Sequence, residues 1–152
     1  MEKIHYSSKS NIWETPQEFF DMLDKEFAFT IDVCATKETA KCKRYYTPID
    51  NGLEQIWQGR CWMNPPYGRE IIKWMEKAYK SAISKQATVV CLVPARTDTV
   101  WWQKYASKGD IWFIPKRLKF KGGQSSAPFP SAIIVFRPSV LTYNKQFNCG
   151  LT

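Results

Sequence analysis

Four consecutive residues, Asn64-Pro65-Pro66-Tyr67, form the segment of this sequence best suited to bind and polarise a substrate. Two adjacent prolines fix the backbone and cannot donate hydrogen bonds to a neighbouring strand, so the carbonyl groups there are available to a ligand. Asn64 adds a side-chain acceptor, and Tyr67 adds a flat ring with a polar tip. The set suits a planar substrate with an amino group, whose two hydrogens are accepted by Asn64 Oδ1 and the Pro65 carbonyl while Tyr67 stacks on the ring. The alternative is a plain turn before a helix.

The composition excludes several other kinds of catalysis. His5 is the only histidine and lies near the N-terminus, so Ser-His-Asp and Cys-His mechanisms lack their base. The five cysteines are odd in number and include no C-x-x-C pair, which predicts neither a disulfide framework nor a zinc site. We therefore expect buried thiols in a reducing compartment and no metal.

The elements around Asn64 predict an α/β fold. Apolar runs predict strands at 29–33, 60–63, 88–93, 111–114 and 132–136, with a brief strand at 44–47. Helical spacing predicts one helix after Thr15 and a long one after Gly68, with a weak helix within 34–43 and another carrying Trp101, Trp102 and Tyr105. Thr15 is the expected N-cap of the first helix, with Pro16 at its first position, and Thr97 or Asp98 is the expected cap of the last.

Alternation of strands and helices predicts a mostly parallel sheet, with ligands bound beyond the carboxyl ends of its strands. The last two strands have no helix between them and are expected to run antiparallel. Asn64 directly follows the strand at 60–63, which places the candidate segment at the ligand-binding edge of the sheet.

Length and charge indicate one small basic domain. The 152 residues suffice for a single core, which we expect at 13–140, between a loose arm at 1–12 and a tail at 141–152. No apolar run approaches the ~18 residues of a membrane span, and residues 1–5 lack a signal segment, so a cytoplasmic protein is expected. The net charge of +8, with seven Trp, seven Tyr and nine Phe, favours nucleic acid as partner.

The sequence resembles the phage-encoded DNA adenine methyltransferases of the Dam type, a family of amino-methyltransferases whose signature (D/N/S)-P-P-(Y/F) is here Asn64-Pro65-Pro66-Tyr67. The resemblance runs in order through most of residues 13–136, in blocks at 13–16, 29–36, 40–42, 51–53, 62–69, 94–99, 116–120 and 129–132. It implies a single-domain Rossmann-like methyltransferase fold, S-adenosylmethionine as cofactor, and N6-methyladenine in DNA as product. The expected location is then the cytoplasm of a bacterial host.

The resemblance also implies residue roles. The catalytic residues are Asn64, Pro65, Pro66 and Tyr67. The cofactor-binding residues are Trp13, Thr15, Pro16, Asp32, Cys34, Ala35, Asp50 and Asn64. Asp50 is expected near the cofactor's ribose or adenine. One departure concerns the turn after the first strand, 32–36, which contains no glycine, so the backbone must approach the cofactor past small side chains.

The target adenine is paired inside duplex DNA, so it must be flipped out of the helix before reaction. The expected DNA contacts are Arg69, Arg96, Lys116, Arg117, Lys119 and Lys121. About 28 residues separate Ala35 from Asn64, too few for a separate recognition domain. Recognition then depends on short loops or on a second subunit, which leaves a homodimer open. Three alternatives also stay open: an inactive DNA-binding module of the same fold, and a methyltransferase that acts on RNA adenine or on protein glutamine.

Overall fold

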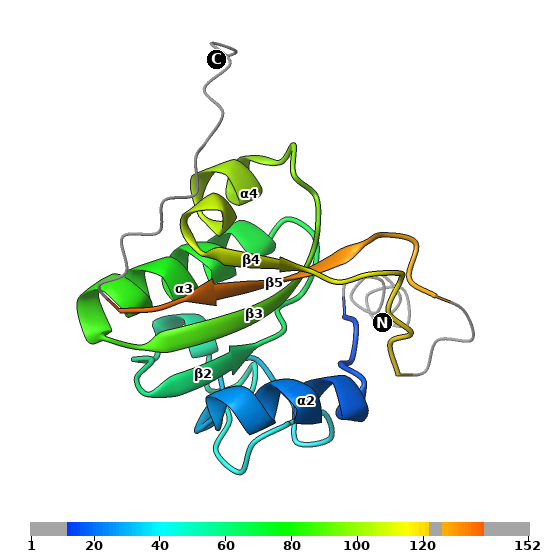
Figure 1. Ribbon diagram of the computed structural model, residues 1–152. Coiled ribbons are helices and arrows are strands. Elements are labelled where there is room, and N and C mark those ends of the chain that lie inside the picture. The colour runs from blue at the N-terminus through cyan, green and yellow to red at the C-terminus, as the bar shows by residue number, and fades with distance from the viewer. Residues whose placement is uncertain (1–11, 122–125, 139–152) are drawn as a thin grey trace, which may run out of the picture.

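The computed structural model describes residues 12–121 and 126–138, which form one five-stranded sheet with helices on both faces (Figure 1). The predicted arm, apart from Ile12, and the predicted tail lie outside the described residues, as do His5 and Cys149. Among the cysteines within these ranges, all four are free thiols. No described helix is long and apolar enough to span a membrane.

The sheet has the strand order β1-β2-β3-β5-β4. Its strands are β1 (Ile31–Asp32), β2 (Arg60–Met63), β3 (Thr88–Pro94), β4 (Asp110–Phe113) and β5 (Ser131–Phe136). β1, β2 and β3 pair in parallel, whereas β5 is antiparallel to both β3 and β4. β5 is therefore the reversed strand, and β4 points the same way as the first three.

The α/β class and the antiparallel pairing of the last two strands are confirmed, but a mostly parallel sheet is not. Two of the four pairings are antiparallel, because β5 enters between β3 and β4 instead of joining the edge. The apolar pattern of β5 shows that it is buried, and every one of its residues is. It cannot show which strands lie on either side.

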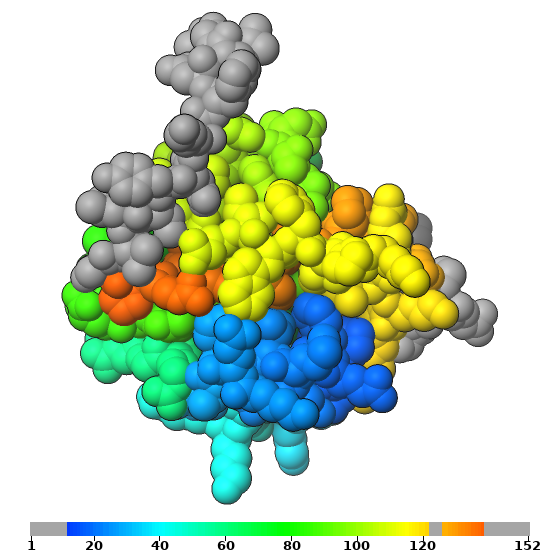
Figure 2. Space-filling model, viewed as in Figure 1, coloured from blue at the N-terminus to red at the C-terminus, as the bar shows by residue number. Residues whose placement is uncertain are grey.

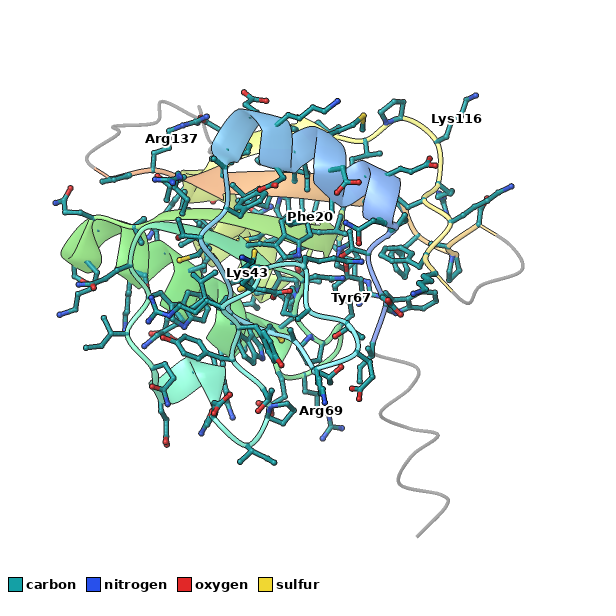
Figure 3. All side chains as sticks on the ribbon, turned by 90° about the horizontal axis from the view of Figure 1, so that it is seen from below. Phe20, Lys43, Tyr67, Arg69, Lys116 and Arg137 are labelled. Carbon is teal, nitrogen blue, oxygen red and sulfur yellow. The ribbon has the colours of Figure 1, made fainter. Side chains whose placement is uncertain are left out.

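Two helices cover opposite faces of the sheet (Figures 1 and 3). α2 (Gln17–Phe27) presents Phe20 to the Trp62 ring of β2, with centroids 5.4 Å apart, and Phe27 to Trp112 of β4. α3 (Ile71–Lys85) packs on β3 from the other face through the apolar stripe that its sequence predicts. The short α4 (Val100–Lys104) packs beside α3, and its Trp101 and Trp102 are buried in the core.

Four local predictions are wrong. The N-cap of α2 is Pro16 without a side-chain cap, and that of α4 is Thr99, whose Oγ1 accepts from Trp102 N. Residues 34–43 contain turns but no helix, and within 44–47 the pairing is limited to a bridge between Asp32 and Tyr45. The polar stretch 34–59, with the single turn η1 (Gly52–Glu54), instead forms the loops around a cavity.

Candidate active site

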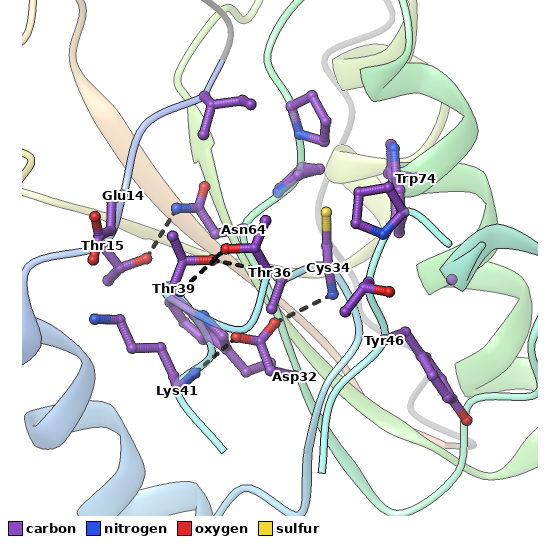
Figure 4. Close-up of a pocket in the computed structure, with 18 of the residues that line it drawn as sticks. Glu14, Thr15, Asp32, Cys34, Thr36, Thr39, Lys41, Tyr46, Asn64 and Trp74 are labelled. Carbon is purple, nitrogen blue, oxygen red and sulfur yellow. Dashed lines mark hydrogen bonds between the residues drawn. The ribbon is translucent and has the colours of Figure 1, made fainter. Parts of the chain in front are cut away.

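A cavity of about 460 Å³ lies at the carboxyl ends of β1 and β2 (Figure 4). Its walls come from the segment before α2, from the loops that follow β1, from Asn64, Pro65 and Pro66 after β2, and from Glu70 and Trp74 at the start of α3. This is the edge of the sheet at which the sequence places a ligand. The volume lies within the ~300–1,000 Å³ of small-molecule sites.

The Asn64 side chain is fixed at the wall of this cavity. Its Nδ2 donates one hydrogen bond to the main-chain carbonyl of Trp13 and another, of 2.9 Å, to Thr15 Oγ1. The Trp13 carbonyl can only accept, so it requires the nitrogen on that side of the amide. Oδ1 is buried and has no hydrogen-bond partner among the described residues. An acceptor without a donor is costly to bury, which points to a ligand donor at this position.

Asp32 closes the turn after β1 in place of a glycine-rich loop. Its carboxylate is 2% exposed and accepts from the main-chain N–H groups of Cys34, at 3.2 Å, and Lys41, at 3.1 Å (Figure 4). These bonds draw residues 34–41 around the cavity, where Ala35 presents only a methyl group. Burial raises the pKa of Asp32 to about 7, although both hydrogen bonds favour its charged form. Burial also raises the pKa of the Cys34 thiol to about 12, so this thiol is neutral.

Tyr67 lies in a different environment from Asn64. Its side chain is 1% exposed, and its hydroxyl donates to the Leu92 carbonyl at 3.1 Å. The Phe120 and Phe129 rings lie against it edge-on, with centroids 6.4 and 5.6 Å away. Tyr67 does not line the cavity. Stacking of this ring on a substrate would require these neighbours to move, and that role stays a prediction.

Six of the eight predicted cofactor residues line the cavity, namely Trp13, Thr15, Asp32, Cys34, Ala35 and Asn64. Pro16 caps α2 outside it. Asp50 is exposed, and its carboxylate accepts from the main-chain N–H and the hydroxyl of Thr47, so it shapes the 47–50 turn.

Sequence reasoning missed Gly52 and Trp74, which also line the cavity. A Cβ on Gly52 would lie 2.3 Å from the Val33 carbonyl oxygen and 3.2 Å from the Trp74 ring. Trp74 in turn stacks on Trp57, whose Nε1 donates to the Gly52 carbonyl. The Asn51-Gly52 turn was visible in the sequence, but nothing there indicated that α3 would bring an indole ring against it.

The predicted DNA contacts lie on the exposed surface near the same edge of the sheet. Lys116 and Arg69 point outward from the molecule (Figure 3). Arg96 lies over the Phe129 ring, with 5.4 Å between its Cζ and the ring centroid. Arg117 donates a hydrogen bond to the Ala127 carbonyl. Lys121 Nζ lies 3.3 Å from Glu14 Oε1, and the Lys119 side chain is exposed. The segment at 114–121 lies directly against the start of the described chain (Figure 2).

The charged groups of the cavity do not form a metal site. Within residues 12–121 and 126–138, no three His, Cys, Asp or Glu side chains are grouped so that they could hold an ion. The cavity instead combines aromatic and small side chains with one fixed, unpartnered acceptor. Such a set can hold a flat organic ligand and accept a hydrogen from an amino group.

Comparison with known proteins agrees with this chemistry. The family model for DNA N-6-adenine-methyltransferase (Dam) matches residues 4–148. The DNA N-6-adenine-methyltransferase of Haemophilus phage HP1 is 28% identical over 141 residues, which cover 86% of this chain and 81% of the phage protein. YfdM of Escherichia coli (strain K12), which carries the name of a methyltransferase, is 35% identical over 63 residues, 36% of this chain and 69% of YfdM. The chain therefore belongs to the DNA N-6-adenine-methyltransferase (Dam) family of enzymes.

Proposed function

We propose that this protein transfers the methyl group of S-adenosylmethionine to N6 of an adenine flipped out of DNA, at Asn64. The observation that carries the proposal is the unpartnered Oδ1 of Asn64, which is held at the cavity wall by the two hydrogen bonds that the amide nitrogen donates. Family membership supports DNA adenine as the substrate. The proposed fold is a small Rossmann-like domain at 13–140. The sheet supports it, because four of its five strands point the same way and only β5 is reversed.

The cavity residues fit S-adenosylmethionine. Trp13 would lie against its methionine end, beside Thr15 and Asn64, while Gly52 and Trp74 provide a flat apolar surface for its adenine. Glu14 and Glu70 also line the cavity and provide carboxylates for a cationic ligand. When bound, this cofactor supplies an electrophilic methyl group. The glycine-free turn does not fill the site, because Ala35 lies there with its single methyl group.

Asn64 is proposed to make the N6 amine of adenine a better nucleophile. The nitrogen lone pair is delocalised into the ring, which makes it a poor nucleophile. Asn64 Oδ1 accepts one amino hydrogen, and the Pro65 carbonyl is proposed to accept the other, which favours pyramidal nitrogen and stabilises the positive charge that develops on it. No histidine is required, because the product ammonium loses its proton readily once the methyl group has been transferred.

DNA is proposed to approach along the basic surface that includes Arg96 and Lys116. Extruding the base costs a few kcal/mol, which contacts with the extruded base offset in part. Contacts between lysine or arginine and phosphate supply most of the remaining affinity, and they make binding sensitive to salt.

The direct test is nucleoside mass spectrometry of DNA incubated with the purified protein and cofactor carrying a deuterated methyl group. We expect labelled N6-methyladenine from the wild type, and a rate at least ~100-fold lower from Asn64→Ala, the loss typical of one preorganised polar group. Calorimetric titration with S-adenosylmethionine should show binding to both proteins, since the lining of aromatic and small side chains is kept.

Three results would each contradict the proposal: near-normal transfer by Asn64→Ala, label that appears only in RNA or in protein glutamine, or no cofactor binding at millimolar concentration. The last would identify an inactive DNA-binding module.

A further inference from the structure

We infer that Thr15 is a positioning residue, which together with the Trp13 main chain orients the Asn64 amide so that Oδ1 is left to accept from the substrate. The inference rests on the proposed function, because it names what sets the direction of that acceptor. Thr15 is 2% exposed, and its Oγ1 lies 2.9 Å from Asn64 Nδ2 (Figure 4).

The orientation of the amide decides whether the site accepts or donates. A primary amide nitrogen carries two hydrogens, and here both are used, one on the Trp13 carbonyl and one on Thr15 Oγ1. A flipped amide would set Oδ1 against the Trp13 carbonyl oxygen and turn Nδ2 toward the substrate's amino group. Donor would then face donor, and the nitrogen would not be activated.

Thr15 is available for this role because it does not cap α2. The helix begins at Gln17 with no side-chain cap, so the Thr15 hydroxyl is not engaged by an N–H of the first turn. Its partner lies 49 positions later in the chain, at the end of β2. The short segment before α2 therefore reaches across the carboxyl edge of the sheet to contact the candidate catalytic residue.

The segment that carries Thr15 is itself held on its other side. Lys121 N donates to the Glu14 carbonyl at 3.1 Å, and Lys121 Nζ lies 3.3 Å from Glu14 Oε1. The Trp13 ring contacts Phe120 and Phe129 edge-on, with centroids 5.4 and 5.1 Å away. Contacts to the connection between β4 and β5 thus hold Trp13 and Glu14, the two residues that precede Thr15, in place.

The test compares Thr15→Val, which keeps the shape and removes the acceptor, with Thr15→Ser, which keeps the oxygen. We expect kcat to fall by about tenfold in the valine variant, as for the removal of one hydrogen bond, and to recover most of its value in the serine variant. KM for DNA should stay within about twofold, because no contact to DNA is removed. Thr30→Val is the matched control, since its hydroxyl bonds Arg60 at the opposite edge of the sheet.

A second background separates positioning from direct cofactor binding. If Thr15 acts through Asn64, Thr15→Val should lower kcat no further when Asn64→Ala is already present. A similar fall in both backgrounds, or a cofactor Kd raised about tenfold by Thr15→Val in both, would overturn the inference and make Thr15 a direct cofactor contact.

Nitrogen-15 NMR of the side-chain amide tests the orientation without any turnover. In the wild type both Asn64 Nδ2 protons should be hydrogen-bonded and slow to exchange, and Thr15→Val should release one of them. Unchanged amide signals in Thr15→Val would overturn the inference even if kcat falls in that variant. Absence of transfer by the wild type, with both protons bonded, would instead reject the proposed function and keep the orientation.

Discussion

Asn64 and Tyr67 stand three positions apart in one segment, yet they belong to two different environments. Asn64 lines a cavity and has a free acceptor, whereas Tyr67 is enclosed by aromatic rings and has its hydroxyl satisfied. The first environment is built by β1, β2 and the loops between them. The second is built by Phe120 and Phe129, which come from the connection between β4 and β5.

The candidate site therefore has a preformed side, the cavity beside Asn64, and a closed side, the ring cluster around Tyr67. The cavity beside Asn64 keeps its volume because Asp32, Gly52 and Trp74 fix its walls through hydrogen bonds and close packing. Beside Tyr67 the space that a stacked base would need is filled by the protein's own rings. Under the proposed function, the cavity beside Asn64 would bind the cofactor without rearrangement, whereas the aromatic side would have to rearrange to admit a base.

The largest expected effect is on stability, from truncation of the enclosed ring. Tyr67→Ala should lower the free energy of unfolding by about 3–5 kcal/mol, as for other large buried aromatic side chains. Asn64→Ala should lower it by only about 1 kcal/mol, because water can reach the freed partners from the cavity. Urea unfolding followed by tryptophan fluorescence measures both. Equal stability losses would show that the two environments are not distinct.

Neutralising the basic residues at 116–121, next to the ring cluster around Tyr67, tests whether this surface binds DNA. Replacing Lys116, Arg117, Lys119 and Lys121 by glutamine should weaken DNA binding by ~100-fold at moderate salt and reduce the slope of log K against log[salt] by roughly one for each phosphate that is no longer neutralised. Cofactor binding should be unchanged, because none of the four lines the cavity. Fluorescence anisotropy with a labelled duplex over a salt series gives the slope, and an unchanged slope would remove this loop from the interface.

Sequence patterns predicted the position of Asn64 at the end of its strand, for a physical reason. A strand of four residues followed by two prolines must end abruptly, so the position of Asn64 at the carboxyl edge of β2 follows from local chemistry. The buried runs of β3 and β5 likewise specify their own burial. The apolar run at 29–33 likewise predicted a strand there, and the structure has a shorter one, Ile31–Asp32, that ends at Asp32.

The parts that sequence missed depend on partners far along the chain. Thr15 has every local feature of a helix cap, but its hydroxyl binds Asn64, 49 positions away, instead of the N–H groups of α2. The burial of Tyr67 depends on Phe120 and Phe129, which no spacing rule connects to it. The loops at 34–59 show no helical or strand periodicity in their sequence. Hydrogen bonds such as that from Lys41 N to Asp32 position them instead, and no local pattern predicts such bonds.

The dependence of stability on pH tests the cavity side, through the carboxyl group of Asp32. The pKa of Asp32 is raised to about 7 in the folded protein from 3.8, so between these values the folded state holds more protons than the unfolded state. Stability should therefore fall as pH rises through this window, by about 2 kcal/mol between pH 5 and 7. Burial raises the pKa of Tyr67 far above this range, so the aromatic side does not titrate there.

Asp32→Asn is the variant that tests this assignment. The asparagine side chain cannot ionise, so the stability of this variant should lack the fall between pH 5 and 7. Its overall stability should be lower, because the side-chain NH2 group would point at one of the two main-chain N–H groups that now donate to the carboxylate. Chemical unfolding at each pH gives the difference between the two proteins. An identical pH dependence in both would assign the titration to another group.

The smallest expected effect comes from removing a single hydroxyl, either from Tyr67 or from Tyr46. Tyr67→Phe should lower the free energy of unfolding by about 1 kcal/mol, because it leaves the Leu92 carbonyl without its partner in a dry interior. Tyr46→Phe removes a comparable bond, 3.3 Å to the Ile56 carbonyl, but at an exposed site where water replaces it, so its effect should be close to zero. Urea midpoints of the two variants give the contrast directly. If Tyr67→Phe were as neutral as Tyr46→Phe, water would already reach the Leu92 carbonyl, and the aromatic side would be open enough in solution to admit a base without rearrangement.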